Sequence, residues 1–345
     1  TGAQKKQLRK RHTDNTEAYQ LYLKGRYYWN KRLEESLAKG IEYFERAISS
    51  DPNYALAYAG LADSYNLLTG YSALQPREAF PIAKAAAMKA LELDDRLAEA
   101  HTSLAYVKCW YEWDWNGAEQ AFRKAISLNP GYSIAHLWYS LYLVAMERID
   151  EAIAEVERAK QLDPLSLIIN LNLARIHYFA RDYDEAIALC QKTIDLYPDF
   201  SLAYRRLGQT YVQKAMYDRA IEAFHKALSL SETDTDTMAA LGHAYALTGK
   251  RAAAEGVIEE LDRVSGHLYV SPYSMARVYL GLDDKDQAMR WLEKSYEERY
   301  GILVYLRVEP IFDSLRADSR FEDLLRRIFS PSNSGIRIAE FNKLD

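Results

Sequence analysis

The 345-residue sequence is poor in cysteine, proline and long apolar runs. Its two cysteines, Cys109 and Cys190, are too few and too far apart for a secreted disulfide framework, so we expect a reducing, cytoplasmic location. No run approaches the roughly 18 to 20 apolar residues that a membrane span needs, and no signal-peptide pattern opens the chain. We therefore expect no membrane partner. Only nine prolines and fifteen glycines interrupt the chain, which suits an all-helical fold.

Positive charge and metal-ligand spacings are also scarce. The net charge is −5, so the chain lacks the excess of cations that a general nucleic-acid binder needs, and nucleic acid is disfavoured as a partner. Seven histidines are scattered, and neither His-Glu-x-x-His nor Cys-x-x-Cys occurs, so we expect no metal and no cofactor. No nucleophile and base stand in a recognisable arrangement, so we expect no enzyme.

What the sequence does contain is a period of 34 residues. One row of alanines and a second row of small residues follow it: Ala118, Ala152, Ala186, Ala220, Ala254 and Ala288, then Ser140, Ala174, Gly208, Gly242 and Ala276. A fixed period between roughly 20 and 50 residues marks a repeat architecture, in which each unit is one supersecondary motif. Function is therefore expected on a surface and not in a catalytic pocket.

Each period predicts two helices joined by a short turn. In residues 201–234, Tyr204, Gly208 and Tyr211 share one face of the first helix, and Ala220 and Phe224 share one face of the second. The two small residues leave room where the helices cross, and the phenylalanine ring fills the space beside them.

This layout resembles the tetratricopeptide repeat, which has small residues at the helix crossing, aromatic residues beside them and a proline after the second helix. The proline slot is filled by Pro52, Pro130, Pro164 and Pro198. The resemblance implies an all-α fold, an α-solenoid of stacked helix-turn-helix repeats that forms a right-handed superhelix. We expect eight repeats within residues 18–302, near 18–53, 54–97, 98–132, 133–166, 167–200, 201–234, 235–268 and 269–302.

The two ends of the chain lie outside these repeats. Residues 1–17 contain the basic run "KKQLRKRH", which is expected to be a linker, with a contact to nucleic acid or an acidic partner as the alternative. Residues 303–330 have their own apolar pattern and predict a pair of capping helices, and 331–345 predict a tail. Because the first residue is Thr1, we expect a fragment of a longer protein with an upstream domain.

A closer resemblance covers the whole chain. The phrases "NTEAYQLYLKGRYYWNKR", "DPNYALAYAGLADSY" and "LRADSRFEDLLRR" are similar to the C-terminal repeat region of multidomain bacterial signalling proteins. In that group, such arrays follow a winged-helix DNA-binding domain, a serine/threonine kinase domain or an adenylyl cyclase domain. The resemblance implies a regulatory module in signal transduction or transcription that serves a fused output domain.

In tetratricopeptide arrays the first helix of each repeat lines the concave side, so the resemblance also names candidate ligand-binding residues. They are Tyr22, Arg26, Trp29, Asp63, Asn66, Tyr106, Trp138, Asn172, Arg175, Tyr178, Arg205, Arg206, Gln209, Gln213, His243, Tyr273 and Arg277. Arginines pair with carboxylates at two points, and aromatic rings offer wide contact area. We expect Arg205 and Arg206 to stay exposed, because a buried unpaired guanidinium is costly. Trp138 is as readily explained by packing between repeats.

The sequence leaves three functions open. The first is a non-enzymatic protein–protein interaction scaffold that binds an acidic peptide or protein segment in the concave groove. The second is a small-molecule sensor that controls a fused output domain. The third, reading of single-stranded RNA, fits the aromatic residues and arginines but conflicts with the negative net charge. Assembly into a homo-oligomer also stays open.

Overall fold

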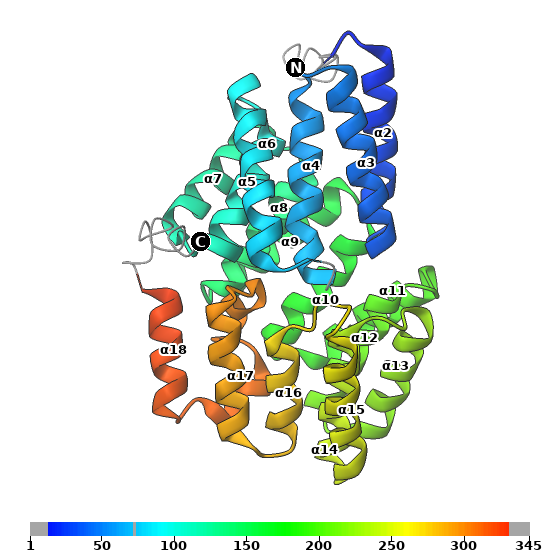
Figure 1. The fold of residues 1–345 in the computed structure, drawn as a ribbon, viewed down its shortest axis with the longest axis vertical. Coiled ribbons are helices and arrows are strands. Elements are labelled where there is room, and N and C mark those ends of the chain that lie inside the picture. Colours follow the sequence, from blue (N-terminus) through cyan, green and yellow to red (C-terminus); the bar gives the residue numbers. More distant parts are fainter. Residues whose placement is uncertain (1–12, 72–73, 331–345) are drawn as a thin grey trace.

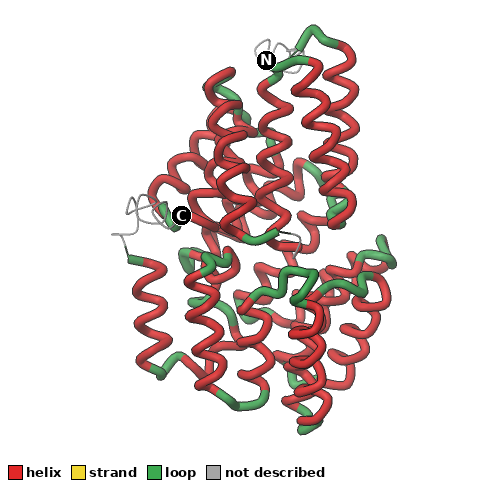
Figure 2. Tube along the Cα trace, in the orientation of Figure 1, coloured by secondary structure: helices red, strands yellow, loops and turns green. Residues whose placement is uncertain are grey.

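The computed structural model describes residues 13–71 and 74–330. Within these residues the chain forms helices and turns and has no β-strand (Figure 2). The basic run at 5–12 and the tail at 331–345 lie outside the described residues. In the described part of the chain, no helix is both long enough and apolar enough to cross a membrane.

Eight helical hairpins follow one another along the chain (Figure 1), one in each of the eight expected ranges. The first four are α2 (Thr16–Asn30) with α3 (Glu34–Ser50), α4 (Ala55–Leu68) with α5 (Pro76–Leu93), α6 (Ala98–Val107) with α7 (Trp115–Leu128), and α8 (Ser133–Ala145) with α9 (Ile149–Leu162). The other four are α10 (Leu167–Phe179) with α11 (Tyr183–Leu196), α12 (Ser201–Gln213) with α13 (Tyr217–Leu230), α14 (Thr235–Leu247) with α15 (Arg251–Val264), and α16 (Pro272–Gly281) with α17 (Lys285–Glu297).

The hairpins stack in two layers. The first helices contact one another in series from α2 to α16, and each second helix lies mainly against its own partner and the next first helix. The first helices therefore form an inner wall and the second helices an outer layer, as expected for a solenoid. The predicted all-α solenoid of stacked hairpins is confirmed.

Small residues set the spacing of the helices, as the sequence pattern predicts. A Cβ atom added to Gly208 on α12 would lie 2.6 Å from the ring of Phe224 on α13. The ring of Phe44 on α3 lies equally close to Gly25 on α2 and Gly60 on α4, where an added Cβ would be 2.6 Å and 2.5 Å away. The helices can therefore approach this closely only because the residue at each of these crossings is a glycine, which has no side chain.

In the fourth to eighth hairpins the turn between the two helices keeps the same backbone conformation although its sequence varies. Glu147, Arg181, Ala215, Gly249 and Asp283 recur at the same period, and all have positive φ angles between 55° and 74°. The residue after each donates its backbone N–H to a carbonyl near the end of the first helix, as Met216 does to Tyr211 at 2.9 Å. This αL cap satisfies the terminal carbonyls of the helix, although only one of the five residues is a glycine.

Two features depart from the regular repeat. A π-helical turn, η2 (Lys108–Glu112), extends α6 and accommodates the extra residue of the third repeat. A 3-10 helix, η1 (Thr69–Tyr71), follows α4, where the second repeat has its insertion. Both features lie at the ends of inner-wall helices, so the wall is locally reshaped in the second and third hairpins.

The C-terminal region differs from the expected pair of capping helices. Only α18 (Ser319–Phe329) packs on α17 as a capping helix (Figure 1). Before it, η3 (Gly301–Tyr305) and η4 (Pro310–Leu315) are 3-10 helices, and η3 contacts η1, η2 and α8. The apolar residues of η3 are contiguous and lack helical spacing, so they do not form one apolar face as those of a capping helix would. They are buried on all sides instead.

Candidate functional site

All seventeen candidate residues lie on the first helices of the hairpins and therefore on the inner wall. They do not form one open groove. Residues 301–315, called the inner segment below, return from the end of the array to this wall and contact it through η3. Their position divides the wall into an aromatic part on α2 to α8 and an arginine part on α10 to α16.

In the aromatic part the predicted residues pack on one another. The ring of Tyr106 lies 4.2 Å from that of Trp110 and 4.6 Å from that of Trp138, centroid to centroid. Trp29 reaches the same cluster, 6.5 Å from Trp138, and both tryptophans are buried. These rings are core residues, as the alternative interpretation of Trp138 allowed.

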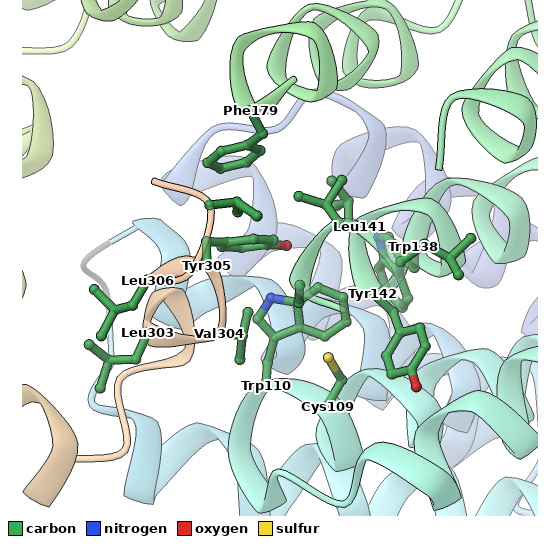
Figure 3. Packing of buried hydrophobic residues seen from close by; sticks show 14 of the residues in the cluster. Cys109, Trp110, Trp138, Leu141, Tyr142, Phe179, Leu303, Val304, Tyr305 and Leu306 are labelled. Atoms are coloured by element: carbon green, nitrogen blue, oxygen red, sulfur yellow. The ribbon is translucent and has the colours of Figure 1, made fainter. Parts of the chain in front are cut away.

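The inner segment covers this aromatic cluster. Tyr305 stacks on Phe179 with a centroid distance of 5.2 Å, and its other side faces Trp110 at 6.5 Å (Figure 3). Leu303, Val304 and Leu306 are fully buried around it, as Figure 3 shows. The sequence signal for this contact is the contiguous apolar run at 302–306, which no helical period explains.

Two polar candidates of the aromatic part, Arg26 and Asp63, are paired with each other. Arg26 forms an ion pair with Asp63 at 2.9 Å, and its guanidinium lies 4.0 Å above the Trp29 ring. Asp63 also accepts a hydrogen bond of 2.6 Å from the Ser103 hydroxyl. Burial raises the pKa of the Asp63 carboxyl, although Arg26 opposes the shift. This ion pair therefore joins α2 to α4, and its two charges are balanced without a ligand.

The remaining candidates of the aromatic part have similar roles. Asn66 is buried and donates a hydrogen bond of 3.0 Å to the carbonyl oxygen of Ser103. Tyr22 is half-buried, and its ring centroid lies 5.4 Å from that of Tyr54. Burial raises the pKa of Tyr22 to about 12. Both side chains contribute to contacts between neighbouring hairpins.

Two acidic residues of the inner segment meet the start of the arginine part. The Tyr178 hydroxyl donates a hydrogen bond of 2.5 Å to Glu309, and both residues are buried. Arg181 binds Asp313 through both terminal nitrogens, at 2.6 Å and 2.9 Å. Burial and the neighbouring Glu309 carboxylate raise the pKa of Tyr178. The chain thus places its own carboxylates, Glu309 and Asp313, at the part of the inner wall where the sequence predicts that a ligand's carboxylates bind.

Arg205 does not present a free charge. Its guanidinium pairs with Asp234 at 3.0 Å and with Asp236 at 3.3 Å, and only 17% of its side chain is exposed. The expectation of an exposed Arg205 assumed that burial would leave the guanidinium unpaired. Instead, two carboxylates at the start of α14 compensate the burial, and the residue joins α12 to α14.

Three other guanidiniums form what we call the arginine cluster: Arg175 on α10, Arg206 on α12 and Arg277 on α16. Among the described residues, none of the three has a carboxylate at ion-pair distance. The charges of Arg206 and Arg277 are close enough to Tyr178 to oppose the rise of its pKa. Those of Arg175 and Arg206 act on Tyr305 in the same way. Glu309 of the inner segment, whose charge acts on Arg206, already accepts the Tyr178 hydrogen bond.

Two arginines of the cluster pack on aromatic rings, and some of their N–H groups have no hydrogen-bond acceptor. Arg175 lies 4.3 Å above the Tyr305 ring, and Arg206 lies 5.4 Å from the Tyr178 ring centroid. The Nε atoms of both arginines are buried without a hydrogen-bond partner. Although Arg206 keeps part of its side chain exposed, the surrounding protein and the charge of Arg175 lower its pKa to about 10. The site therefore disfavours its own positive charge unless an anion joins it.

A small cavity of about 10 Å³, partly open to the surface and with room for about one water molecule, lies beside the cluster. Gln209, His243 and Arg277 line it together with Ile311 of the inner segment. His243 Nδ1 donates a hydrogen bond of 2.9 Å to the carbonyl oxygen of Arg277, and burial together with the Arg277 charge lowers the His243 pKa to about 4. The Gln209 Oε1 atom is buried without a partner.

Three candidates on this part of the wall remain. Asn172 is buried and donates 2.8 Å to the carbonyl oxygen of Ile168 in its own helix. Tyr273 is buried edge-on against Phe312 of the inner segment, 5.4 Å between centroids. Gln213 is half-buried at the end of α12. In residues 13–71 and 74–330, no group of histidine, cysteine and acidic side chains could hold a metal ion.

Sequence comparisons identify the repeats of the central region. Tetratricopeptide-repeat profiles match residues 110–166, 143–209 and 201–234. The chain is 24% identical over 169 residues to the transcriptional regulator HilA of Salmonella paratyphi A, which covers 49% of the chain and 30% of HilA. It is 33% identical over 89 residues to the Hsp70-Hsp90 organising protein of Plasmodium falciparum, which covers 24% of the chain and 16% of that protein. The chain thus matches less than a third of either relative.

Solved structures share the fold. The structure of the APC/C hetero-tetramer Cut9-Hcn1 has a TM-score of 0.58, with 18% sequence identity over 85% of this chain and 52% of that chain. Yeast Tom70 has a TM-score of 0.51, with 17% identity over 92% of this chain and 69% of that chain. At these identities the likeness establishes the α-solenoid fold of stacked helical hairpins and no more.

Proposed function

We propose that this solenoid is a non-enzymatic interaction module that binds an acidic peptide or protein segment at the arginine part of its inner wall. The observation that carries the proposal is the arginine cluster: among the described residues none of its three guanidiniums has a carboxylate at ion-pair distance, and Glu309, whose charge acts on Arg206, is already hydrogen-bonded to Tyr178. A carboxylate bound at the exposed parts of Arg175 and Arg206 would offset the positive charge that Arg206 now carries at a cost.

The chemistry of the cluster selects an acidic side chain over a neutral one. Guanidiniums on aromatic rings are fixed in orientation, so little side-chain entropy is lost when they bind. Charge-assisted hydrogen bonds in a partly dry site are worth more than those at an open surface, typically about 1.5 to 3 kcal/mol each. A segment with one or two carboxylates is therefore the expected ligand.

The similarities support a protein partner and a regulatory setting. Tetratricopeptide-repeat proteins are in general interaction scaffolds, and the name of the Hsp70-Hsp90 organising protein states that role. The similarity to the regulator HilA favours a module of a larger bacterial signalling or transcription-regulating protein in the cytoplasm. A fused output domain would then receive the signal of ligand binding.

A small anionic metabolite is the second candidate ligand. The arginine cluster favours it, since Arg175 and Arg206 are only partly buried and guanidiniums bind carboxylate or phosphate groups of small molecules as well as those of peptides. In that case one metabolite would raise the melting temperature in the absence of peptide, as any ligand selective for the folded state does.

The test uses a fluorescent acidic hexapeptide, Glu-Asp-Leu-Glu-Asp-Leu, and the full chain. Arg206→Gln and Arg175→Gln should each weaken binding by roughly tenfold, because each removes one charge-assisted contact. Arg219→Gln, on the exposed surface of α13, is the matched control and should bind as the wild type does. Circular dichroism verifies that helicity is unchanged. Equal binding by all four proteins would remove the cluster from the proposal.

A further inference from the structure

The first helix of the array carries an exposed apolar stripe. Tyr19, Leu23 and Tyr27 are 46%, 47% and 59% exposed, and their spacing of four residues places them on one face of α2. In the described residues, α2 packs mainly on α3 and α4, which lie on its other sides. This outer face of α2 therefore has no helix on it.

The equivalent face is covered in the later hairpins. Aligning Gly25 with Ser140 places the stripe at Ile134, Trp138 and Tyr142 of α8. These three residues are only 6%, 2% and 3% exposed, because the preceding hairpin of α6 and α7 packs on them. Phe122 of α7 contacts Tyr142, with 6.1 Å between centroids. The stripe on α2 is thus a stacking face of the array that lacks its neighbour.

Charge indicates what kind of neighbour fits. Lys24 and Lys31 are exposed beside the stripe, and the Lys31 ammonium lies 4.7 Å above the Tyr27 ring. Two copies of the chain joined through this face would bring the Lys24 and Lys31 side chains of both copies together, and their like charges would repel. A helix with acidic flanks would be attracted instead.

We propose that the outer face of α2 is a docking surface for an amphipathic helix with acidic flanks. The helix would pack on Tyr19, Leu23 and Tyr27 as the second helix of each hairpin packs on the next first helix. Apolar side chains would fill the stripe, and glutamates or aspartates would face Lys24 and Lys31. The stripe lies on the first hairpin, whereas the arginine cluster lies on α10, α12 and α16, so this surface does not depend on the proposed ligand of the cluster.

The probe is a fluorescent peptide with the sequence of α9, which packs on α10 in this way and has four acidic and two basic residues. We expect anisotropy to show binding to the full chain with a Kd below about 1 mM. Leu23→Asp should weaken it at least tenfold or so, since a carboxylate replaces the centre of the stripe. Leu196→Asp, the same substitution at an exposed leucine of α11, is the control and should leave binding unchanged.

Three results would overturn the proposal. The first is no binding at about 1 mM peptide, or equal binding by Leu23→Asp. The second is equal binding of a peptide whose four acidic residues are changed to glutamine, which would remove the role of the lysines. The third is a wild-type dimer in sedimentation that Leu23→Asp dissociates, because a second copy would then cover the face. Loss of binding in Arg206→Gln would place the peptide on the inner wall and would also contradict it.

Discussion

The two parts of the inner wall use the same repeat positions for opposite purposes. On α2 to α8, Trp29, Tyr106 and Trp138 are closed off by each other and by the inner segment. On α10 to α16, Arg175 and Arg206 retain unpartnered N–H groups. Aromatic faces are satisfied by any apolar neighbour, and the chain supplies one from its own C-terminal region. Guanidiniums need anions, and the same region supplies too few.

The largest expected effect comes from opening the aromatic part. Tyr305→Ala removes the ring between Phe179 and Trp110 and should lower the free energy of unfolding by about 3 to 5 kcal/mol. Urea denaturation measures the loss. Tyr27→Ala, which removes an exposed ring, should change it by less than about 0.5 kcal/mol. A similar small loss for both variants would mean that the inner segment is not part of the core.

The arginine part can be probed through pH. The pKa of His243 is about 4 in the folded chain and 6.5 ordinarily, so between these values the unfolded chain binds more protons. The stabilisation due to neutral His243 is complete above about pH 6.5, and it is lost as the pH falls toward 4, by roughly 3 kcal/mol in total. His243→Asn should lack this part of the pH dependence. Urea titrations of both proteins at about pH 7 and pH 5 make the comparison.

If both proteins lose the same free energy of unfolding between these pH values, the Arg277 charge and the burial of His243 do not act on it as described. Residual pH dependence in His243→Asn is expected from the many carboxylates of the chain, so the difference between the two proteins is the informative quantity.

A smaller effect should follow from removing the Glu309 carboxylate, whose charge acts on Arg206 of the arginine cluster. Glu309→Gln weakens the hydrogen bond from Tyr178 and should cost about 1 to 2 kcal/mol of stability. The same change leaves the cluster more positive, so affinity for the acidic hexapeptide should rise several-fold. Asp313→Asn is the control, because its partner Arg181 lies outside the cluster. A fall in affinity for Glu309→Gln would show that Glu309 helps to bind the peptide.

The smallest effect lies in the turns, which serve both parts of the wall equally. Ala215 has a φ of 55°, a conformation that costs a non-glycine residue about 1 kcal/mol or more. Ala215→Gly should therefore raise the free energy of unfolding by about 0.5 to 1 kcal/mol. Ala154→Gly, at an exposed position inside α9, should lower it by a similar amount. If both variants change the free energy of unfolding in the same direction, the αL conformation assigned to Ala215 is wrong.

The sequence predicts the hairpins well because their cause is local and periodic. Gly208 and Phe224 meet as their spacing requires, and the first helices carry every candidate residue. The burial of those residues depends on contacts that no period encodes. Tyr178 meets Glu309 from 131 positions away, and the run at 302–306 has no repeat register to reveal its place.

The charge partners show the same limit in another form. Arg205 pairs with Asp234 and Asp236 at the start of α14, 29 and 31 positions ahead, a contact that the repeat register could have suggested. The arginine cluster is different, because its three members come from separate hairpins and share no partner. Only the folded arrangement distinguishes a paired arginine from one that still needs an anion.

Hydrogen–deuterium exchange of the full chain, with and without the acidic hexapeptide, tests the central claim most directly. The peptide should slow exchange in α10 and α12 and leave α6 and η2 unchanged, because Arg175 and Arg206 are only partly buried whereas the aromatic part is closed. Protection of α6 and η2 together with faster exchange at residues 301–315 would contradict this account, since the peptide would then have displaced the inner segment from the wall.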